Sequence, residues 1–135
     1  MIRFHYRYPA MRVREAGRLK SWLAGVAKNE GKSVSSMDYI FVDDPVLLEI
    51  NRQSLHHDYF TDIITFPYQS KPIIGEIYIS VDRIREHAAE YGVSFSQELH
   101  RVMVHGLLHL CGYSDKSGKE KKRMTEKEDF YLDQV

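Results

Sequence analysis

Two histidines four residues apart, His105 and His109, have the residue type and spacing in this 135-residue chain that best suit metal binding. On a helix this spacing places both imidazoles on one face, one turn apart, close enough to bind one metal ion. Gly112 then predicts the end of the helix and a return of the chain, and Asp115 follows as a carboxylate able to reach the same ion. Three protein ligands leave a fourth position for water, as in catalytic zinc sites. We therefore expect one Zn²⁺ ion bound by His105, His109 and Asp115, and a hydrolytic reaction.

The alternative is that the two histidines are ordinary surface or core side chains, which is the commoner case for a bare pair at this spacing. Here the residues between and after them, Leu107, Leu108 and Leu110, are apolar. The helix is therefore expected to pack inside the protein, where imidazoles without partners are costly. This context favours a metal site. Imidazole also binds nickel, copper and iron, so zinc is the default rather than the only option.

Two more side chains of the same predicted helix could assist this site. Glu98 lies seven residues before His105, and its carboxylate could orient a ligand histidine. It could equally interact with the positive end of the helix dipole without contacting the site. Arg101, on the same side of the helix, could face a phosphate group or only solvent.

Periodicity and capping signals predict the elements that must position this helix. Strands are expected at 2–8 and 39–42, and a hairpin at 61–68 and 73–80. Helices are expected at 13–28, 44–55 and 81–91, then from a capping box at 94–97 to Gly112, and finally from a second capping box at 117–120. The charged segment 119–129 suggests a solvated surface for the last helix. The sequence thus predicts a single domain, 1–135, of the α/β (α+β) class: a small mixed four-stranded sheet packed with about five helices, with the metal-bearing helix at its centre.

Composition narrows the class of protein. Hydrophobic residues make up 43% of the chain and charged residues 28%, which is typical of a globular protein. Apolar runs are far shorter than the roughly 20 residues of a membrane-spanning helix, so no membrane partner is expected. The single cysteine, Cys111, favours a reducing, cytoplasmic location.

The 19 basic and 19 acidic residues cancel, which argues against a strongly basic nucleic-acid-binding domain. Residues 1–32 nevertheless hold eight basic groups against Glu15 and Glu30, a local excess of six positive charges (8 − 2). This excess could bind a polyanion, or it could pair with the acidic remainder as surface charge.

The segment 105–115, HGLLHLCGYSD, resembles the hallmark HGxLHLxGYDH of the YbeY family, bacterial endoribonucleases of rRNA maturation. Asn51 with the segment 61–67, TDIITFP, resembles the family block LNxxYRxxDxPTDVLSFP, and 75–77 resembles its GDI. The resemblance extends from about Val42 to the C-terminus. It implies metal-dependent cleavage of single-stranded RNA, with precursor rRNA as substrate, maturation of the small-subunit rRNA 3′ end and ribosome quality control as the process, and ribosomal particles as partners. No DNA partner is expected.

Two positions depart from the family pattern. Asp115 stands where the family has a third histidine, which keeps an oxygen ligand but changes the charge of the site. Leu55 stands where the family has an arginine proposed to act on substrate, so that role cannot be assigned to it. His57, or its neighbour His56, could replace the arginine as a cationic or proton-transferring group, or could be an exposed loop histidine.

Two other functions remain open at this point. A zinc peptidase or other hydrolase could use the same ligand pattern, but Gly106 occupies the position where peptidases of the HExxH type have their general-base glutamate. A non-catalytic ribosome-assembly factor could use the metal only to lock the helix to the following loop, with RNA contacts from the basic N-terminal third, and the absent arginine keeps this alternative open.

Overall fold

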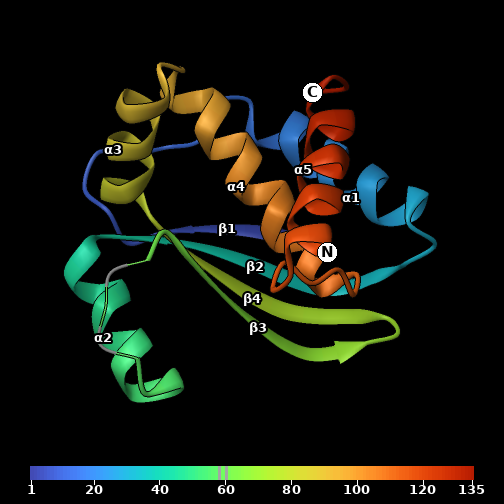
Figure 1. Cartoon of the computed structure of the whole chain (residues 1–135), viewed down its shortest axis with the longest axis horizontal. Coiled ribbons are helices and arrows are strands. Elements are labelled where there is room, and N and C mark those ends of the chain that lie inside the picture. Colours follow the sequence, from blue (N-terminus) through green and yellow to red (C-terminus); the bar gives the residue numbers. More distant parts are fainter. Residues whose placement is uncertain (58, 60) are drawn as a thin grey trace.

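The computed structural model (Figure 1) describes residues 1–57, 59 and 61–135. These residues form four strands and five helices, and the two histidines lie near the end of the fourth helix. The elements in chain order are β1 (Ile2–Tyr6), α1 (Ala16–Asn29), β2 (Val34–Val42), α2 (Asp44–Leu55), β3 (Ile63–Ser70), β4 (Ile73–Ser80), α3 (Val81–Tyr91), α4 (Phe95–Leu110) and α5 (Gly118–Leu132). The predicted α/β class with a mixed four-stranded sheet is confirmed. None of the described helices is long and apolar enough to span a membrane.

The sheet has the strand order β1-β2-β4-β3. Strand β2 pairs in parallel with both β1 and β4, and β3 closes the edge as the antiparallel partner of β4 in the predicted hairpin. Strand β2 is central, which explains why its residues 39–42 are an uninterrupted buried run. It begins at Val34 rather than at the predicted residue 39, because its polar first half pairs with β4 from Val34 onward and with β1 from Met37 onward.

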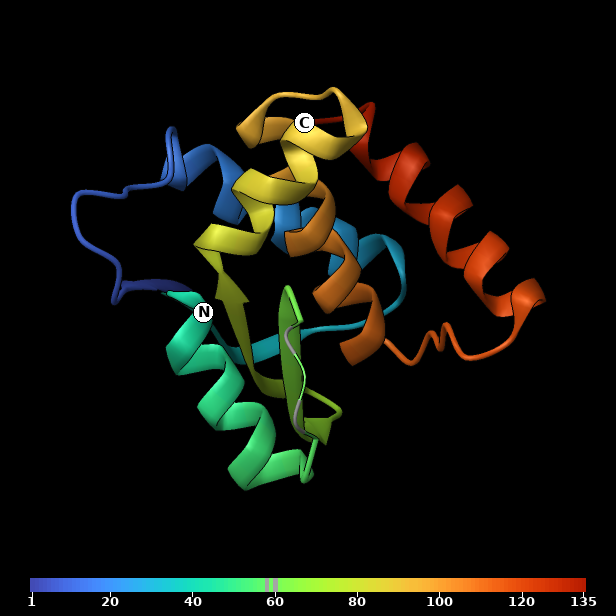
Figure 2. The same cartoon turned by 60° about the vertical axis from the view of Figure 1, so that its left-hand side comes forward.

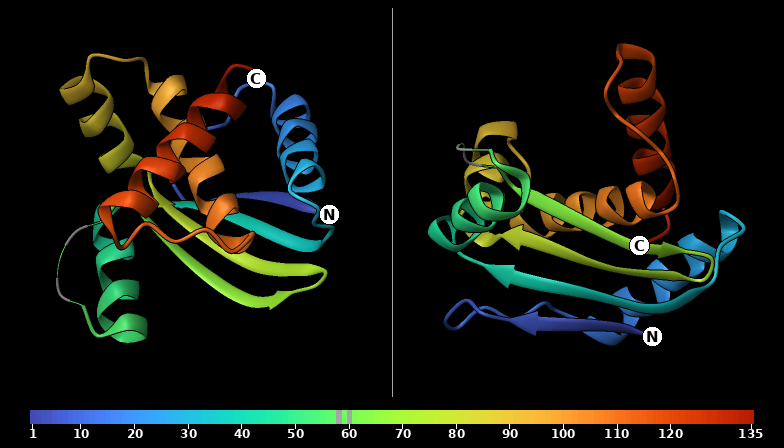
Figure 3. Two further views of the ribbon diagram at one scale, coloured as in Figure 1. Left: turned by 45° about the vertical axis from the view of Figure 1, so that its right-hand side comes forward. Right: turned by 90° about the horizontal axis from the view of Figure 1, so that it is seen from below.

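Four helices, α1, α3, α4 and α5, lie on one side of the sheet, while α2 lies on the other side at one end (Figures 1 and 3). Most of the apolar core fills the space between the sheet and the four helices, and a smaller cluster lies beneath α2. After α4 the chain crosses to α5, which runs back alongside α4 (Figure 2). Helix α1 begins at Ala16, later than predicted, because Glu15 has a left-handed backbone with φ 54°.

Helix α4 lies close to the sheet because two glycines leave room for it. A Cβ atom on Gly106 would lie 2.9 Å from Ile63 Cδ1, and one on Gly75 in β4 would lie 3.0 Å from Leu110 Cδ1. A side chain at either position would require the neighbouring Ile63, Ile77 or Leu110 side chains to shift. The glycines therefore allow the close contact between α4 and the sheet.

The two ends of α4 form by the local signals that the sequence predicted. The capping box of Ser94 and Gln97 is present at the start of the helix. At the other end Gly112 has φ 108°, its N–H donates to the His109 carbonyl at 3.0 Å, and the Tyr113 N–H donates to the Leu108 carbonyl at 3.0 Å. These two bonds are the Schellman arrangement, which reverses the chain immediately after the second histidine.

Most of the charged segment 119–129 of helix α5 is exposed, as predicted, but one face of the helix is buried. Its residues Met124, Glu128 and Tyr131 are buried. They follow one another at intervals of four and three residues, which places them on one face of the helix. Trp22 in α1 donates its indole N–H to the Tyr131 carbonyl at 3.0 Å, so α5 is held against both α1 and α4.

Candidate metal centre

The structure brings His105, His109 and Asp115 together at the end of α4. The two Nε2 atoms are 3.0 Å apart, and Asp115 Oδ2 lies 3.4 Å from Nε2 of His105 and 3.5 Å from Nε2 of His109. Donors about 2.1 Å from a tetrahedral ion are separated by about 3.4 Å, so these distances fit one Zn²⁺ with almost no rearrangement. The three atoms could hold one metal ion.

The other ring nitrogens determine which tautomer each histidine adopts. His109 Nδ1 is 2.9 Å from the carbonyl oxygen of Tyr113, which can only accept a hydrogen bond, so Nδ1 is the donor. His105 Nδ1 is 2.6 Å from the Glu128 carboxylate. With both Nδ1 atoms protonated, both Nε2 atoms can direct a lone pair toward the centre of the site, as metal ligation requires.

The charges around His105 and its burial act on its pKa in opposite directions. Burial alone lowers the pKa of His105, but the hydrogen bond and negative charge of Glu128, together with the charges of Asp115 and Asp62, raise it above its ordinary value. A proton therefore competes with a metal ion for Nε2, and we expect metal affinity to increase with pH.

The carboxylate that orients His105 is Glu128 of α5, not Glu98 as the sequence suggested. Glu128 is only 6% exposed and accepts the Nδ1 hydrogen bond. Glu98 lies two turns before His105 on α4, and its carboxylate instead lies within 4.8 Å of ligand atoms of Asp62 and His87. The separation along the helix axis explains the correction, because two turns exceed the reach of a glutamate side chain.

Sequence reasoning missed Glu128 because its contact with His105 joins residues 23 apart in the chain. The only local signal was the spacing of Met124, Glu128 and Tyr131, which places a single carboxylate on an otherwise apolar helix face. A buried carboxylate of this kind requires a partner.

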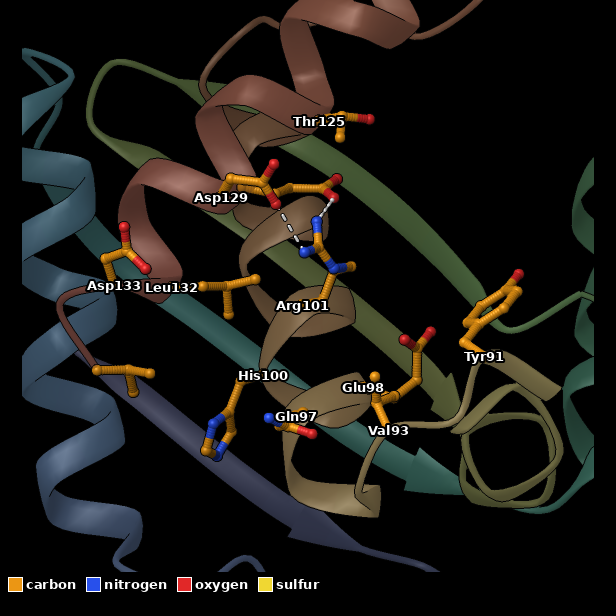
Figure 4. Close-up of a pocket in the computed structure, with 12 residues that line it drawn as sticks. Tyr91, Val93, Gln97, Glu98, His100, Arg101, Thr125, Asp129, Leu132 and Asp133 are labelled. Atoms are coloured by element: carbon orange, nitrogen blue, oxygen red, sulfur yellow. Dashed lines mark hydrogen bonds and ion pairs between the residues drawn. The ribbon is translucent and has the colours of Figure 1, made fainter. Parts of the chain in front are cut away.

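The sequence left open whether Arg101 faces a phosphate group or solvent, and the structure shows that it forms ion pairs within the protein. Its guanidinium donates to Glu128 at 2.9 Å and to Asp129 at 2.7 Å (Figure 4). It thereby holds Glu128 in the position that contacts His105. Arg101 acts on the site through Glu128, as a positioning residue.

His57 lies in the exposed segment after α2. Its Nδ1 is 3.0 Å from the hydroxyl of Tyr59, and the two rings are stacked with centroids 5.1 Å apart. Within the described part of the chain, His57 has no contact with the three candidate ligands. Leu55, at the position of the family arginine, is the last residue of α2 and is 40% exposed.

A buried glutamate anchors the loop that contains Asp115. Glu30, just after α1, accepts hydrogen bonds from Tyr113 at 2.6 Å, from Lys127 at 3.2 Å and from Tyr131. Burial alone would raise the pKa of Glu30, but these three donors outweigh burial and lower it. The loop between α4 and α5 is thus tied to α1 and α5, which limits where Asp115 can lie.

Cys111, next to the site along the chain, is not suited to be a fourth ligand. Burial, with a smaller contribution from Glu30, raises the pKa of its thiol to about 11. At neutral pH the group is therefore an uncharged thiol, whereas metals bind the thiolate.

Comparison with known proteins assigns the chain to a family. A family model described as Endoribonuclease YbeY matches residues 11–135. The chain is 47% identical over 133 residues to an endoribonuclease YbeY of Flavobacterium psychrophilum, covering 98% of this chain and 94% of that protein. It is 47% identical over 112 residues to one of Bacteroides thetaiotaomicron, covering 82% of each. The solution structure of a Thermotoga maritima protein is similar with a TM-score of 0.70 and 32% identity, over 98% of this chain and 87% of that one. The chain belongs to the YbeY family.

Proposed function

We propose that this protein is a metal-dependent endoribonuclease that cleaves single-stranded RNA, with one Zn²⁺ bound by His105, His109 and Asp115. The observation that supports this most directly is the convergence of three donor atoms within 3.5 Å of one another. Their side chains remain 23%, 25% and 38% exposed, so water and a substrate phosphate can reach them. A site with three protein ligands that is open to solvent is typical of catalytic rather than structural zinc.

Membership of a family named for an enzyme confirms the expectation that the chain is an enzyme, and an endoribonuclease has RNA as its substrate. The finer assignments rest on the family resemblance of the motifs. We propose precursor rRNA as the substrate, with maturation of the small-subunit rRNA 3′ end and ribosome quality control as the process. Ribosomal particles would be the partners, and the cytoplasm is the compartment that this substrate implies.

The side chains of this site each have a defined task in such a reaction. Bound zinc supplies Lewis-acid chemistry at a phosphate group and lowers the pKa of a coordinated water toward about 7. His105 and His109 would bind the ion through Nε2, because Glu128 and the Tyr113 carbonyl accept their Nδ1 protons. Asp115 would balance one positive charge. Phosphate contacts by basic side chains would dominate RNA affinity and make it sensitive to salt.

The structure argues against the zinc peptidase alternative at Gly106. A Cβ atom there would lie 2.9 Å from Ile63 Cδ1 and 3.1 Å from two atoms of Ile77. A glutamate at this position, as in HExxH peptidases, would enter the apolar contact between α4 and the sheet. Position 106 therefore supplies no general base, and its surroundings are apolar.

The test is cleavage of a single-stranded RNA and of precursor rRNA by zinc-loaded protein, with zinc content measured on the same samples. We expect about one zinc per chain and cleavage in the wild type. His109→Ala should lose both and remain folded by circular dichroism, while His100→Ala, on the same helix outside the site, should retain both.

Three results would contradict the proposal. Equal cleavage by His109→Ala would indicate another site or a contaminating nuclease. A zinc-containing wild type that cleaves no RNA, with ribosome-assembly defects when it is absent, would favour the non-catalytic assembly factor. Peptide cleavage that chelators abolish would favour the peptidase.

A further inference from the structure

A second group of metal-ligating side chains lies beside the candidate zinc site. Asp62, His87 and Glu98 each offer one ligand atom, and these atoms all lie within 4.8 Å of one another. His87 Nδ1 and Asp62 Oδ2 are 3.6 Å apart, which is too long for a hydrogen bond. The three residues come from three elements: the segment before β3, helix α3 and helix α4.

The backbone around this group is well anchored. The Ser80 N–H donates to the Asp62 carbonyl at 3.0 Å, and the Ser80 hydroxyl accepts from the Arg83 N–H at the start of α3. One residue therefore holds Asp62 and caps the helix that contains His87. The arrangement of the three side chains follows from the fold rather than from an exposed loop.

Glu98 is the residue that indicates a missing partner. It is only 5% exposed, yet within residues 1–57, 59 and 61–135 its carboxylate forms no hydrogen bond or ion pair. The nearby cation, Arg101, is bonded to Glu128 and Asp129 instead (Figure 4). Burial and then the charge of Asp62 raise the pKa of Glu98. No buried side-chain oxygen of the described residues lacks a hydrogen-bond partner, so the unpartnered oxygens of Glu98 face the water of the pocket that Glu98 lines. A cation in that pocket could bind them directly and balance their charge.

We propose that Asp62, His87 and Glu98 form a second divalent-cation site, distinct from the site of His105, His109 and Asp115. The donor set, one imidazole and two carboxylates, suits a first-row divalent metal ion. The 3.6 Å between His87 Nδ1 and Asp62 Oδ2 lies between the adjacent and opposite donor separations of an octahedral ion. Donors about 2.2 Å from an octahedral ion are about 3.1 Å apart when adjacent and about 4.4 Å apart when opposite. We therefore assign the site to an exchangeable ion of the Mn²⁺ type, with water as the remaining ligands.

The two sites share a pocket of about 180 Å³. Asp62 and Glu98 line it together with His105 and Glu128. Three carboxylates and one guanidinium, that of Arg101, line this volume, so its net charge is negative while His105 is neutral. This charge favours a second cation there even when the first site holds zinc.

The test is a Mn²⁺ titration of zinc-loaded protein, followed by the electron paramagnetic resonance signal of free Mn²⁺. We expect one additional Mn²⁺ per chain in the wild type, with unchanged zinc content. Glu98→Gln and His87→Asn should each weaken Mn²⁺ binding at least tenfold, and Glu90→Gln, an exposed acidic residue of α3, should not. Nitrogen hyperfine coupling to the bound Mn²⁺ should be present in the wild type and absent in His87→Asn.

The proposal would be overturned if the wild type bound no Mn²⁺ beyond its zinc, or if both variants bound it as the wild type does. The His87→Asn variant keeps the test decisive if Glu98→Gln does not fold, because His87 is a partly exposed side chain. The result is independent of the zinc proposal. His109→Ala should lose zinc and retain the Mn²⁺ site.

Discussion

The hydrogen bond between His105 and Glu128 offers the sharpest test of the candidate zinc site. Glu128→Gln preserves the volume of the side chain and an oxygen that can accept the Nδ1 proton of His105, but it removes the negative charge. The contact is short, 2.6 Å, and Glu128 is nearly buried, so solvent screens this charge little. The substitution therefore isolates the electrostatic contribution of the carboxylate to zinc binding.

Removal of such an outer carboxylate costs about 10- to 100-fold in metal affinity. This corresponds to about 1.4 to 2.7 kcal/mol of binding free energy. We expect the zinc Kd of Glu128→Gln to rise within this range, measured by competition with a chromophoric chelator. In the zinc-free protein, the His105 pKa should also fall, because the main group that raises it has lost its charge.

The control is Glu126→Gln, an exposed glutamate of the same helix, for which we expect an unchanged zinc Kd. Arg101 keeps its bond to Asp129 in Glu128→Gln, so a large change in stability is not expected. A zinc Kd within twofold of the wild type, with the protein folded, would refute the assignment of Glu128 as the residue that supports His105.

Three further predictions concern packing, pH and metal. Gly106→Glu should lower the free energy of unfolding, measured by urea denaturation, by about 3 kcal/mol or more, because the carboxylate would be buried among isoleucines. Gly25→Glu, at an open helix position, should change the free energy of unfolding far less. Since the pKa of Glu30 is lowered by folding, its contribution to stability is present above its unfolded pKa and is lost as the pH falls through the folded value. Urea unfolding of chelator-treated protein between pH 6 and pH 3 should therefore show a steeper loss for the wild type than for Glu30→Gln, and equal slopes would contradict the role of this anchor. Free zinc at about 100 times its Kd should stabilise the wild type by about 2.7 kcal/mol; an equal zinc-dependent shift of Tm in His109→Ala would argue against the site.

Most of the local structure around the site followed from short-range signals. The spacing of His105 and His109 places them on one helix face, and the capping box at Ser94 and the left-handed Gly112 define the ends of that helix. Each signal involves residues within about one helical turn of one another, so the backbone alone relates them. Asp115 is also near enough along the chain for its approach to the two rings to be expected.

The sequence predicted the strands of the sheet in outline, but not where each strand begins and ends. The hairpin of β3 and β4 was expected, but the full length of β2 depends on pairing with β1 and β4, which are distant in the chain. Polar residues remain in that strand because backbone pairing holds them there: Ser36 pairs with β4, and Asp38 pairs with both β1 and β4. Propensity alone predicts a shorter strand.

By itself the sequence determined the three candidate ligands, the helix that presents two of them and the family resemblance of the motifs. Only the tertiary structure decided that Glu128 rather than Glu98 supports His105, and that Asp62, His87 and Glu98 meet. The physical reason is that helix periodicity relates side chains a few residues apart, whereas contacts between α4 and α5, or between α3 and the segment before β3, depend on how whole elements pack. Gly106 and Gly75 allow the close contact between α4 and the strands β3 and β4, which spacing along the chain does not reveal.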